Sequence, residues 1–371
     1  MQKAQSTATT VLQVRDLSLD FVQRAGPVRA LYNIDLEVSE GEILGLIGES
    51  GAGKSLLGST IIKLLPSHAR VASGEVLYAG QNILALDEKA QRAVRGKDIA
   101  MIFQDPQTSL NPLLTIGYQL IETIQTHLGL DKKAAHARAI ALLNEVGIPS
   151  PEARMKAYPH EFSGGQRQRI VIAIAISAEP KVIIADEPTT ALDVSVQAQI
   201  LVLLRKLCDA RKTAIIFITH DMGVLSKIAD RVAVLYAGSV VECGMRDEII
   251  FSPRHPYSKA LMDSIPRMNV GVKRLQQIEG NMPRIGELGR GCPFAPRCVR
   301  VQERCLNELP RMRAGVACWN PWELDRVAQT PSPAKQRVVS AKKDTSHALS
   351  ESIEEEEKTF LARFADTSGQ K

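Results

Sequence analysis

Residues 43–65 read ILGLIGESGAGKSLLGSTIIKLL, and this stretch decides the fold. Its first five residues predict a buried strand, and residues 54–65 predict a helix that ends at Pro66. The glycine-rich loop GESGAGKS, residues 48–55, lies between them. A strand, such a loop and a helix in this order are typical of a phosphate-binding loop. The alternative, a glycine-rich turn without a ligand, is disfavoured because all three parts occur in sequence.

The residue types in the loop suit the binding of nucleotide phosphates. Glycine at 48, 51 and 53 lets backbone N–H groups turn inward without a Cβ in the way. The helix adds the positive end of its dipole. The lysine is predicted to reach the β- and γ-phosphates, and the serine hydroxyl to bind Mg²⁺. The predicted phosphate-binding residues are Gly48, Glu49, Ser50, Gly51, Ala52, Gly53, Lys54 and Ser55.

Two further segments follow the loop in a fixed order. Residues 163–166 read SGGQ, and the acidic pair Asp186-Glu187 ends the apolar run 182–185. Together with the phosphate-binding loop they resemble the ATP-binding cassette (ABC) family. The resemblance implies ATP hydrolysis with Mg²⁺, in a dimer where the SGGQ segment of one subunit closes over ATP held by the other. Phe162 stands where the family more usually has leucine, a mild departure.

The resemblance also implies roles for individual polar residues. Carboxylates at the C-terminal end of a parallel strand point into the crevice where such sheets bind ligands. The resemblance assigns Asp186 to Mg²⁺, through water, and Glu187 to polarising the attacking water. Gln104 is similar to the Q-loop glutamine, which contacts Mg²⁺ and that water. His220 matches the switch histidine that hydrogen-bonds the γ-phosphate, and Asp193 matches the D-loop that contacts the other subunit.

Other contacts to the nucleotide are expected outside the loop. Adenine stacking needs an aromatic side chain upstream of it; Phe21 is best placed, Tyr32 is second, and a core role for Phe21 stays open. Serine at the start of SGGQ is a good helix N-cap, and the two glycines leave the first N–H groups exposed to a γ-phosphate. The residues expected to act across the dimer are Ser163, Gly164, Gly165 and Gln166.

The pattern of apolar residues predicts an α/β fold, a P-loop NTPase of the ABC type with a mainly parallel sheet. Residues 11–22 and 28–38 alternate apolar and polar residues, as half-buried antiparallel strands do. Between about 105 and 180 only helices are expected, at 116–128, 132–146 and 163–178, which indicates an inserted helical lobe. Parallel strands alternating with helices are predicted at 43–47, 98–103, 182–185, 214–219 and 232–236.

We predict three parts along the chain: an ABC ATPase domain at 1–250, a C-terminal extension at 251–323, and a flexible polar tail at 324–371. The tail has too few apolar residues to offset the entropy of ordering. Three segments, FQDPQTSLNP at 103–112, RHPYSKAL at 254–261 and GCPFAPRC at 291–298, look like the ATPase subunits of bacterial oligopeptide, dipeptide and nickel importers.

This narrower resemblance implies partners and a location. The partners would be a second ABC ATPase subunit, identical or different, two membrane permease subunits and an extracytoplasmic solute-binding protein. No apolar stretch reaches the length of a membrane span, and residues 1–10 lack a signal-peptide pattern, so we expect a peripheral protein on the cytoplasmic face of the membrane. A net charge of +5 with 4% aromatic residues argues against a nucleic-acid partner. The rival function, a non-transport ABC ATPase in DNA repair or translation, would carry long heptads or a second cassette.

Four of the six cysteines crowd into the extension, at Cys292, Cys298, Cys305 and Cys318. A cytoplasmic location disfavours disulfides, and four thiolates suit either zinc or an iron–sulfur cluster. The spacing does not decide between them, nor against a segment without metal; the family resemblance favours a 4Fe–4S cluster. We expect the ATP site to be independent of this segment, because the two belong to different domains.

Overall fold

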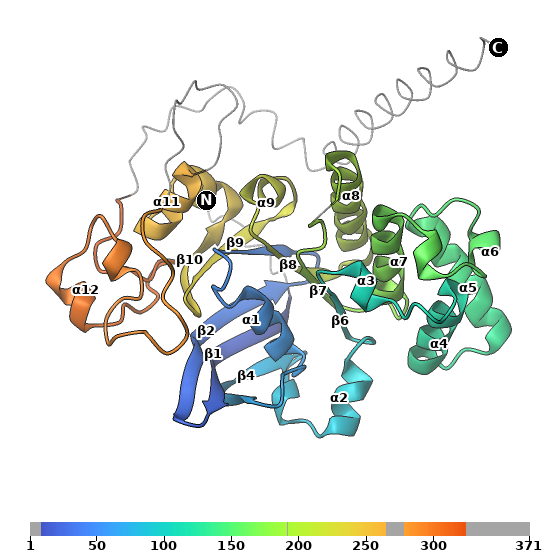
Figure 1. Ribbon diagram of the computed structural model, residues 1–371, viewed down its shortest axis with the longest axis horizontal. Coiled ribbons are helices and arrows are strands. Elements are labelled where there is room, and N and C mark those ends of the chain that lie inside the picture. The colour runs from blue at the N-terminus through green and yellow to red at the C-terminus, as the bar shows by residue number, and fades with distance from the viewer. Residues whose placement is uncertain (1–8, 191, 265–277, 324–371) are drawn as a thin grey trace, which may run out of the picture.

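The computed structural model describes residues 9–190, 192–264 and 278–323, and its frame is two β-sheets (Figure 1). The first sheet is antiparallel, with the order β2-β1-β4-β5. Its strands are β1 (Thr10–Gln23), β2 (Gly26–Ser39), β4 (Ala69–Tyr78) and β5 (Gln81–Asn82). The antiparallel strands predicted at 11–22 and 28–38 are thus confirmed as β1 and β2, which pair with each other.

The second sheet has six strands in the order β10-β9-β3-β8-β7-β6. Neighbours from β9 to β6 are parallel, and β10 closes one edge in the antiparallel direction. The order places β3, which leads into the phosphate-binding loop, between β9 and β8. The strands are β3 (Ile43–Ile47), β6 (Ile99–Ile102), β7 (Val182–Asp186), β8 (Ala214–Thr219), β9 (Arg231–Tyr236) and β10 (Ser239–Met245).

Two hydrophobic cores lie on opposite faces of this second sheet, because alternate residues of a strand point to opposite faces. Ile43 and Ile47 of β3 join the core beneath the helices, whereas Leu44 and Leu46 join the core shared with the first sheet. Helix α1 (Lys54–Ile61) contributes Leu57 to the second of these cores and so packs between the two sheets. The phosphate-binding loop is therefore held by β3, which packs into both cores, and by α1, which packs into one of them.

The helices on the other face form two groups. Helices α8 (Val194–Arg211) and α9 (Met222–Ile228) cover the sheet itself. A helical lobe lies beyond the β6 edge of the sheet, at the right in Figure 1. It contains α3 (Pro106–Ser109), α4 (Ile116–Leu128), α5 (Lys132–Glu145), α6 (Pro151–Arg154) and α7 (Gly164–Ile176).

The C-terminal extension lies at the opposite end of the molecule, beside β10 (Figure 1). Its backbone continues the edge of the sheet, since Cys243 N–H donates to Gly315 O at 2.8 Å and Ala317 N–H donates to Val241 O at 2.8 Å. Phe294 is buried in the main core. The helices here are α10 (Arg246–Phe251), α11 (Pro256–Asp263) and α12 (Glu303–Asn307).

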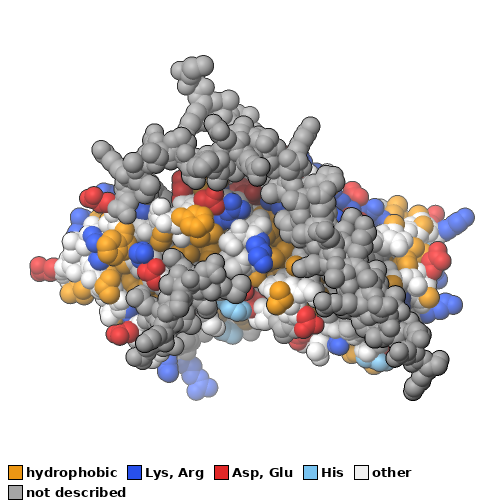
Figure 2. Space-filling model, turned by 90° about the horizontal axis from the view of Figure 1, so that it is seen from above, with side chains coloured by type: hydrophobic (Ala, Val, Ile, Leu, Met, Phe, Trp, Pro, Cys, Tyr) orange, Lys and Arg blue, Asp and Glu red, His pale blue; other side chains and the backbone are white. Residues whose placement is uncertain are grey.

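The predicted parallel strands and lobe helices are confirmed, with ends shifted by at most two residues. The sequence did not predict strands β4, β5 and β10 or the short helices α2 (Glu88–Val94), α3, α6, α10 and α12. The predicted tail at 324–371 lies outside the described residues. Within the described ranges, no helix is long and apolar enough to cross a bilayer. Basic, acidic and apolar side chains are interspersed on the visible part of the face in Figure 2.

Candidate active site

The glycines of the phosphate-binding loop are fixed by backbone geometry. A Cβ at Gly48 would lie 2.2 Å from the carbonyl oxygen of Leu235, so no other residue fits there. Gly51 and Gly53 have φ of 83° and 101°, in the region that favours glycine. Gly53 is also the N-cap of α1. The chain therefore turns sharply from β3 into α1, as the sequence predicted.

Lys54 and Ser55 begin α1 at the edge of this loop. The Lys54 ammonium is buried and donates to the carbonyl oxygens of Gly48 at 2.8 Å and Glu49 at 3.0 Å. Burial lowers the pKa of Lys54, and the nearby acidic side chains oppose that shift. The Ser55 hydroxyl donates to Asp186 Oδ1 at 2.9 Å. The structure thus joins the predicted Mg²⁺ residues of α1 and β7 directly.

Glu187 is the centre of a hydrogen-bond cluster in the same crevice. Its Oε2 accepts from Gln104 Nε2 at 3.0 Å and from the Thr190 hydroxyl at 2.9 Å. Its Oε1 lies 3.1 Å from His220 Nδ1. The φ of Glu187 is +46°, a strained value that turns its side chain differently from that of Asp186.

The electrostatics of the acidic pair differ between its two members. Burial raises the pKa of Asp186, and the hydrogen bond from Ser55 opposes this shift. Burial acts in the same direction on Glu187, but hydrogen bonds from His220 and Thr190 outweigh it and leave its pKa below the ordinary value. Glu187 is therefore a carboxylate at neutral pH, able to accept a proton. Thr190 was not predicted, since a threonine after a Pro-Thr pair carries no signal of its own.

The oxygen atoms present fit Mg²⁺, which prefers hydroxyl, carboxylate and amide oxygens. Ser55, Asp186 and Gln104 supply these three types, and the structure links the first two to each other and the third to Glu187. The grouped side chains thus supply donors for a phosphate chain, oxygen atoms for a divalent cation and a carboxylate for a water.

The SGGQ segment starts α7, away from this cluster, and its hydrogen bonds stay within its own helix end. Ser163 Oγ accepts from Gln166 N–H at 3.3 Å, and Gln166 Oε1 accepts from Ser163 N–H at 3.1 Å, which completes a capping box. Ser163 and Gly164 are exposed, whereas a Cβ at Gly165 would lie 2.6 Å from Val196 Cγ1. Asp193, the N-cap residue of α8, is also exposed. The structure therefore presents this segment to the surface.

The two aromatic candidates for adenine stacking lie on β1 and β2. The Phe21 ring is half-buried and stacks on His68, with ring centroids 5.2 Å apart. The Tyr32 hydroxyl donates to Arg29 O at 3.1 Å, and its backbone N–H donates to Gly238 O at 2.8 Å. Neither observation assigns the adenine contact, which stays a prediction.

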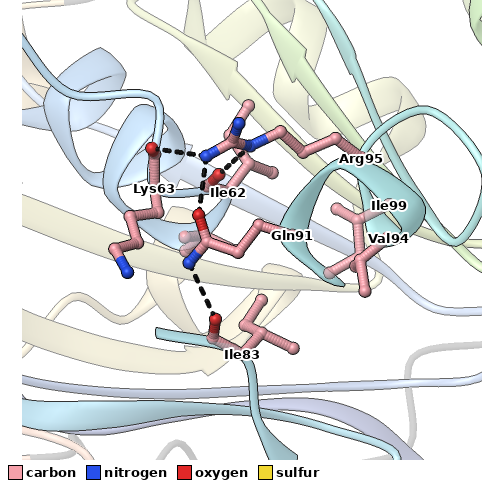
Figure 3. A pocket seen from close by; sticks show the side chains of 8 residues that line it. Ile62, Lys63, Ile83, Gln91, Val94, Arg95 and Ile99 are labelled. Carbon is pink, nitrogen blue, oxygen red and sulfur yellow. Dashed lines mark hydrogen bonds between the residues drawn. The ribbon is translucent and has the colours of Figure 1, made fainter. Parts of the chain in front are cut away.

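One small pocket, shown in Figure 3, lies elsewhere, between α1, α2 and β6. Its volume is about 10 Å³, enough for a single water molecule. Arg95 donates to the carbonyl oxygens of Ile62 at 2.8 Å and Lys63 at 2.9 Å, and Gln91 donates to Ile83 O at 3.1 Å. These polar atoms satisfy one another's hydrogen bonds. The pocket therefore belongs to the packing between these elements and is not a second ligand site.

The four cysteines of the extension lie near one another. Burial raises the pKa of Cys292 to about 11, and the three neighbouring thiols add to the shift. The Sγ atoms of Cys298 and Cys318 accept from the N–H groups of Arg300 and Asn320, each at 3.4 Å. No set of three or more Cys, His, Asp or Glu side chains in the described ranges is placed to hold a metal ion. The predicted iron–sulfur or zinc ligation is therefore not supported by the placement of these side chains.

The extension nevertheless contacts the phosphate-binding loop directly. Arg297 Nη1 lies 2.8 Å from Glu49 Oε2, and Nη2 lies 3.1 Å from Glu49 Oε1. The backbone N–H of Glu49 donates to the Tyr257 hydroxyl at 2.9 Å. The cysteine segment and the ATP site, assigned to different domains from the sequence, are therefore in direct contact, and the independence of ATP binding stays a prediction. A contact between residues 248 positions apart leaves no local signal in the sequence.

Comparisons with known proteins agree with this geometry. The family described as "ABC transporter" matches residues 31–190, and "Oligopeptide/dipeptide transporter, C-terminal region" matches residues 241–305. The Bacillus subtilis oligopeptide transport ATP-binding protein OppD is 48% identical over 82% of this chain and 86% of its own length. The dipeptide transport ATP-binding protein DppD of the same organism is 44% identical over 86% of this chain and 96% of its own length. A solved ATP-binding cassette, a dimer in a post-hydrolysis state bound to ADP and Pi, is 28% identical, with a TM-score of 0.57 over 63% of this chain and 98% of that chain.

Proposed function

Because this chain belongs to the ABC transporter family, among the ATP-binding proteins of oligopeptide and dipeptide transport, we propose that it hydrolyses ATP to energise peptide import through a membrane permease. The observation that carries the proposal is the crevice itself. Lys54 and Ser55 begin a helix on one side, and a Glu187 carboxylate held by three neighbours lies on the other. The relatives reported above are transport proteins, so nothing favours a role in DNA repair or translation.

In the proposed reaction, the loop N–H groups and Lys54 hold the phosphates of ATP. Glu187 accepts a proton from the attacking water, whose oxygen bonds to the γ-phosphorus while the bond to the β–γ bridging oxygen breaks. The products are ADP and inorganic phosphate. Gln104 and Thr190 keep Glu187 Oε2 in place through their hydrogen bonds. His220, whose Nδ1 lies 3.1 Å from Oε1, is proposed to hydrogen-bond the γ-phosphate.

Ser55, Asp186 and Gln104 are the residues that would hold Mg²⁺. When bound, the cation supplies positive charge to the β- and γ-phosphate oxygens. The Ser55–Asp186 hydrogen bond already brings a hydroxyl and a carboxylate oxygen to one point of the crevice. Phe21, with Tyr32 as the second choice, is proposed for adenine stacking.

We propose that two such subunits form the working unit, with Ser163, Gly164, Gly165 and Gln166 of one subunit facing the ATP of the other. The exposed start of α7 supports this arrangement, because free helix N–H groups bind anions well. Asp193, exposed at the start of α8, is proposed to contact the same partner. The dimeric state of the solved relative is consistent with it. A Ser163→Arg subunit mixed with a Lys54→Ala subunit should form at most one ATP-occluded site; a pair that forms none would contradict the arrangement.

The proposed partners outside the dimer are two permease subunits and an extracytoplasmic solute-binding protein, at the cytoplasmic face of the membrane. The domain division proposed for this role is an ATPase domain at 1–250 with its lobe at about 105–180, and an extension at 251–323. A strain that lacks the chain should regain peptide uptake with the wild-type chain but not with Lys54→Ala. Equal uptake with both would contradict the proposal.

For the extension we propose that Cys292, Cys298, Cys305 and Cys318 hold a 4Fe–4S cluster, with zinc as the alternative. Burial raises the pKa of the Cys298 and Cys318 thiols, and the amide N–H groups directed at their sulfur atoms oppose that shift, as donors to a metal-bound thiolate would. Protein purified without oxygen should be brown and bleach with dithionite, and Cys298→Ser should remove the colour. Colourless protein with one zinc per chain would favour the alternative, and protein without metal would overturn both.

A further inference from the structure

We infer that Arg297 is a positioning residue for the phosphate-binding loop: it neutralises the Glu49 carboxylate and thereby ties nucleotide affinity to the cysteine-bearing extension. The inference rests on the proposed function in that it assumes ATP binds at this loop. It adds a contact from outside the cassette, between residues separated by 248 positions.

Glu49 is held at each of its polar groups. Its carboxylate accepts two hydrogen bonds from the Arg297 guanidinium, its N–H donates to the Tyr257 hydroxyl, and its carbonyl oxygen accepts from Lys54. Two of these three contacts come from the extension. The third is made by the lysine that is expected to contact the phosphates. The position of Glu49 is thus set jointly by the extension and by Lys54.

The Arg297 guanidinium is buried and held by several contacts. The Arg297 side chain is 6% exposed, and Nε donates to Glu279 O at 2.9 Å. Arg297 also lies over the Tyr236 ring, 5.8 Å from its centroid, and donates to the Tyr236 hydroxyl at 3.3 Å. A bidentate arginine–carboxylate pair with such support has a defined geometry and is stronger than a neutral hydrogen bond.

An aromatic cluster joins this arginine to the cassette. Tyr236, at the end of β9, has its ring centroid 4.6 Å from that of Tyr257 and 5.2 Å from that of Phe294, and all three rings are buried. His255 begins α11, and its Nδ1 accepts from the Tyr257 N–H at 3.0 Å. The His-Pro-Tyr segment therefore places a tyrosine hydroxyl under the loop, and the cysteine segment places an arginine beside it.

The charge of Glu49 explains why the arginine matters for binding. A carboxylate within the phosphate-binding loop repels a nucleotide that carries several negative charges. The Glu49 side chain is only 26% exposed, so solvent screens that repulsion incompletely. Arg297 cancels the charge and also fixes the loop. Without it, the Glu49 carboxylate would lose both of these hydrogen bonds and the cation paired with it.

The test is a double-mutant cycle read by equilibrium ATP binding. Arg297→Gln should weaken ATP affinity about tenfold, and ADP affinity less, because ADP carries less charge. Glu49→Gln alters the loop itself, so it serves as the second background of the cycle, in which Arg297→Gln should change ATP affinity by less than about threefold. The double variant Glu49→Gln with Arg297→Gln should recover most of the loss, because the uncompensated charge is gone. Arg297→Lys, which keeps the charge, should lose less than Arg297→Gln.

Arg300→Gln is the matched control. Arg300 belongs to the same segment, but it bonds to Asn320 and lies over Trp322, away from the loop. If Arg297 merely stabilised the extension, Arg300→Gln would weaken ATP binding equally and Glu49→Gln would not rescue it; that result overturns the inference. Unchanged affinity in Arg297→Gln and Arg297→Lys would overturn it as well. A wild-type chain that binds no ATP would instead contradict the proposed function.

Discussion

Replacing Glu187 by glutamine removes the proposed proton acceptor with little change of shape. In the structure, Glu187 Oε2 accepts from Gln104 and Thr190, and Oε1 lies beside His220 Nδ1. A glutamine can keep its oxygen toward the two donors, and its amide can donate to Nδ1 in the other neutral tautomer of His220, so that this one hydrogen bond is reversed and not lost. The positive φ is open to glutamine as much as to glutamate. The substitution therefore removes the proton acceptor while the surrounding hydrogen bonds and backbone are kept.

The expected magnitude follows from that separation. Loss of a positioned general base lowers kcat by about 10²- to 10⁴-fold, or about 3 to 5 kcal/mol of transition-state stabilisation. ATP affinity should stay within about threefold, or about 0.6 kcal/mol, because the hydrogen bonds around position 187 are kept. With turnover blocked, ATP-bound dimers should accumulate.

Two measurements on the same preparation check this: steady-state release of phosphate and equilibrium binding of ATP. Glu179→Gln is a suitable control, because that glutamate is exposed, pairs with Arg138 and lies outside the crevice. It should leave both values unchanged. Hydrolysis by Glu187→Gln within about threefold of the wild type would refute the assignment of the base. An equal loss of ATP binding and ATP hydrolysis would show that Glu187 has a structural role and is not the base.

Three further predictions concern other side chains. Lys54→Ala should abolish measurable ATP binding, since the buried ammonium is the loop's only lysine; retained affinity by calorimetry would contradict its role. Thr190→Ala removes a donor that holds the pKa of Glu187 below its ordinary value, so the acidic limb of the kcat–pH profile should move to higher pH, and an unmoved limb would exclude this effect. Burial lowers the pKa of His255 to about 3 in the folded chain. As the pH falls below 6.5, the unfolded chain therefore binds a proton at this histidine, whereas the folded chain does not. The free energy of unfolding should then fall by up to about 1.4 kcal/mol per pH unit as the pH drops from 6.5 towards 3, and His255→Asn, which keeps an N-cap, should lack that part of the slope in denaturant titrations.

The fold was largely predictable because its decisive segments are local. A run such as residues 43–47, followed by glycines and a helix, specifies strand, loop and helix within a single window. The missed strands lack such a window. β4 carries Ser73, Gly74 and Glu75 in its middle and has few buried positions, so its pairing with β1 comes from the sheet and not from its own residues. β10 likewise gains its place by pairing with β9 on one side and with residues of the extension on the other.

The crevice was predictable for a related reason. Parallel strands end at the same edge of a sheet, so polar residues within two positions after β6, β7 and β8 meet there without any further information. Gln104, Glu187 and His220 satisfy this condition, and hydrogen bonds join them in the structure. Thr190 lies three residues beyond the strand-end pair and joins the cluster only because of how the chain turns at Glu187.

The contact between Glu49 and Arg297, by contrast, could not be predicted from the sequence. Glu49 in a phosphate-binding loop is unremarkable by itself, and Arg297 is one of several arginines in a cysteine-rich segment. Their pairing depends on the tilted and edge-to-face packing of Tyr236, Tyr257 and Phe294, which no periodicity encodes. The pairing also changes what the cysteines can affect. Cys298 directly follows Arg297, so any change that displaces the backbone at Cys298 displaces a side chain bonded to the phosphate-binding loop. A perturbation of the extension should therefore be measured as a change in nucleotide affinity and not only as a change in stability.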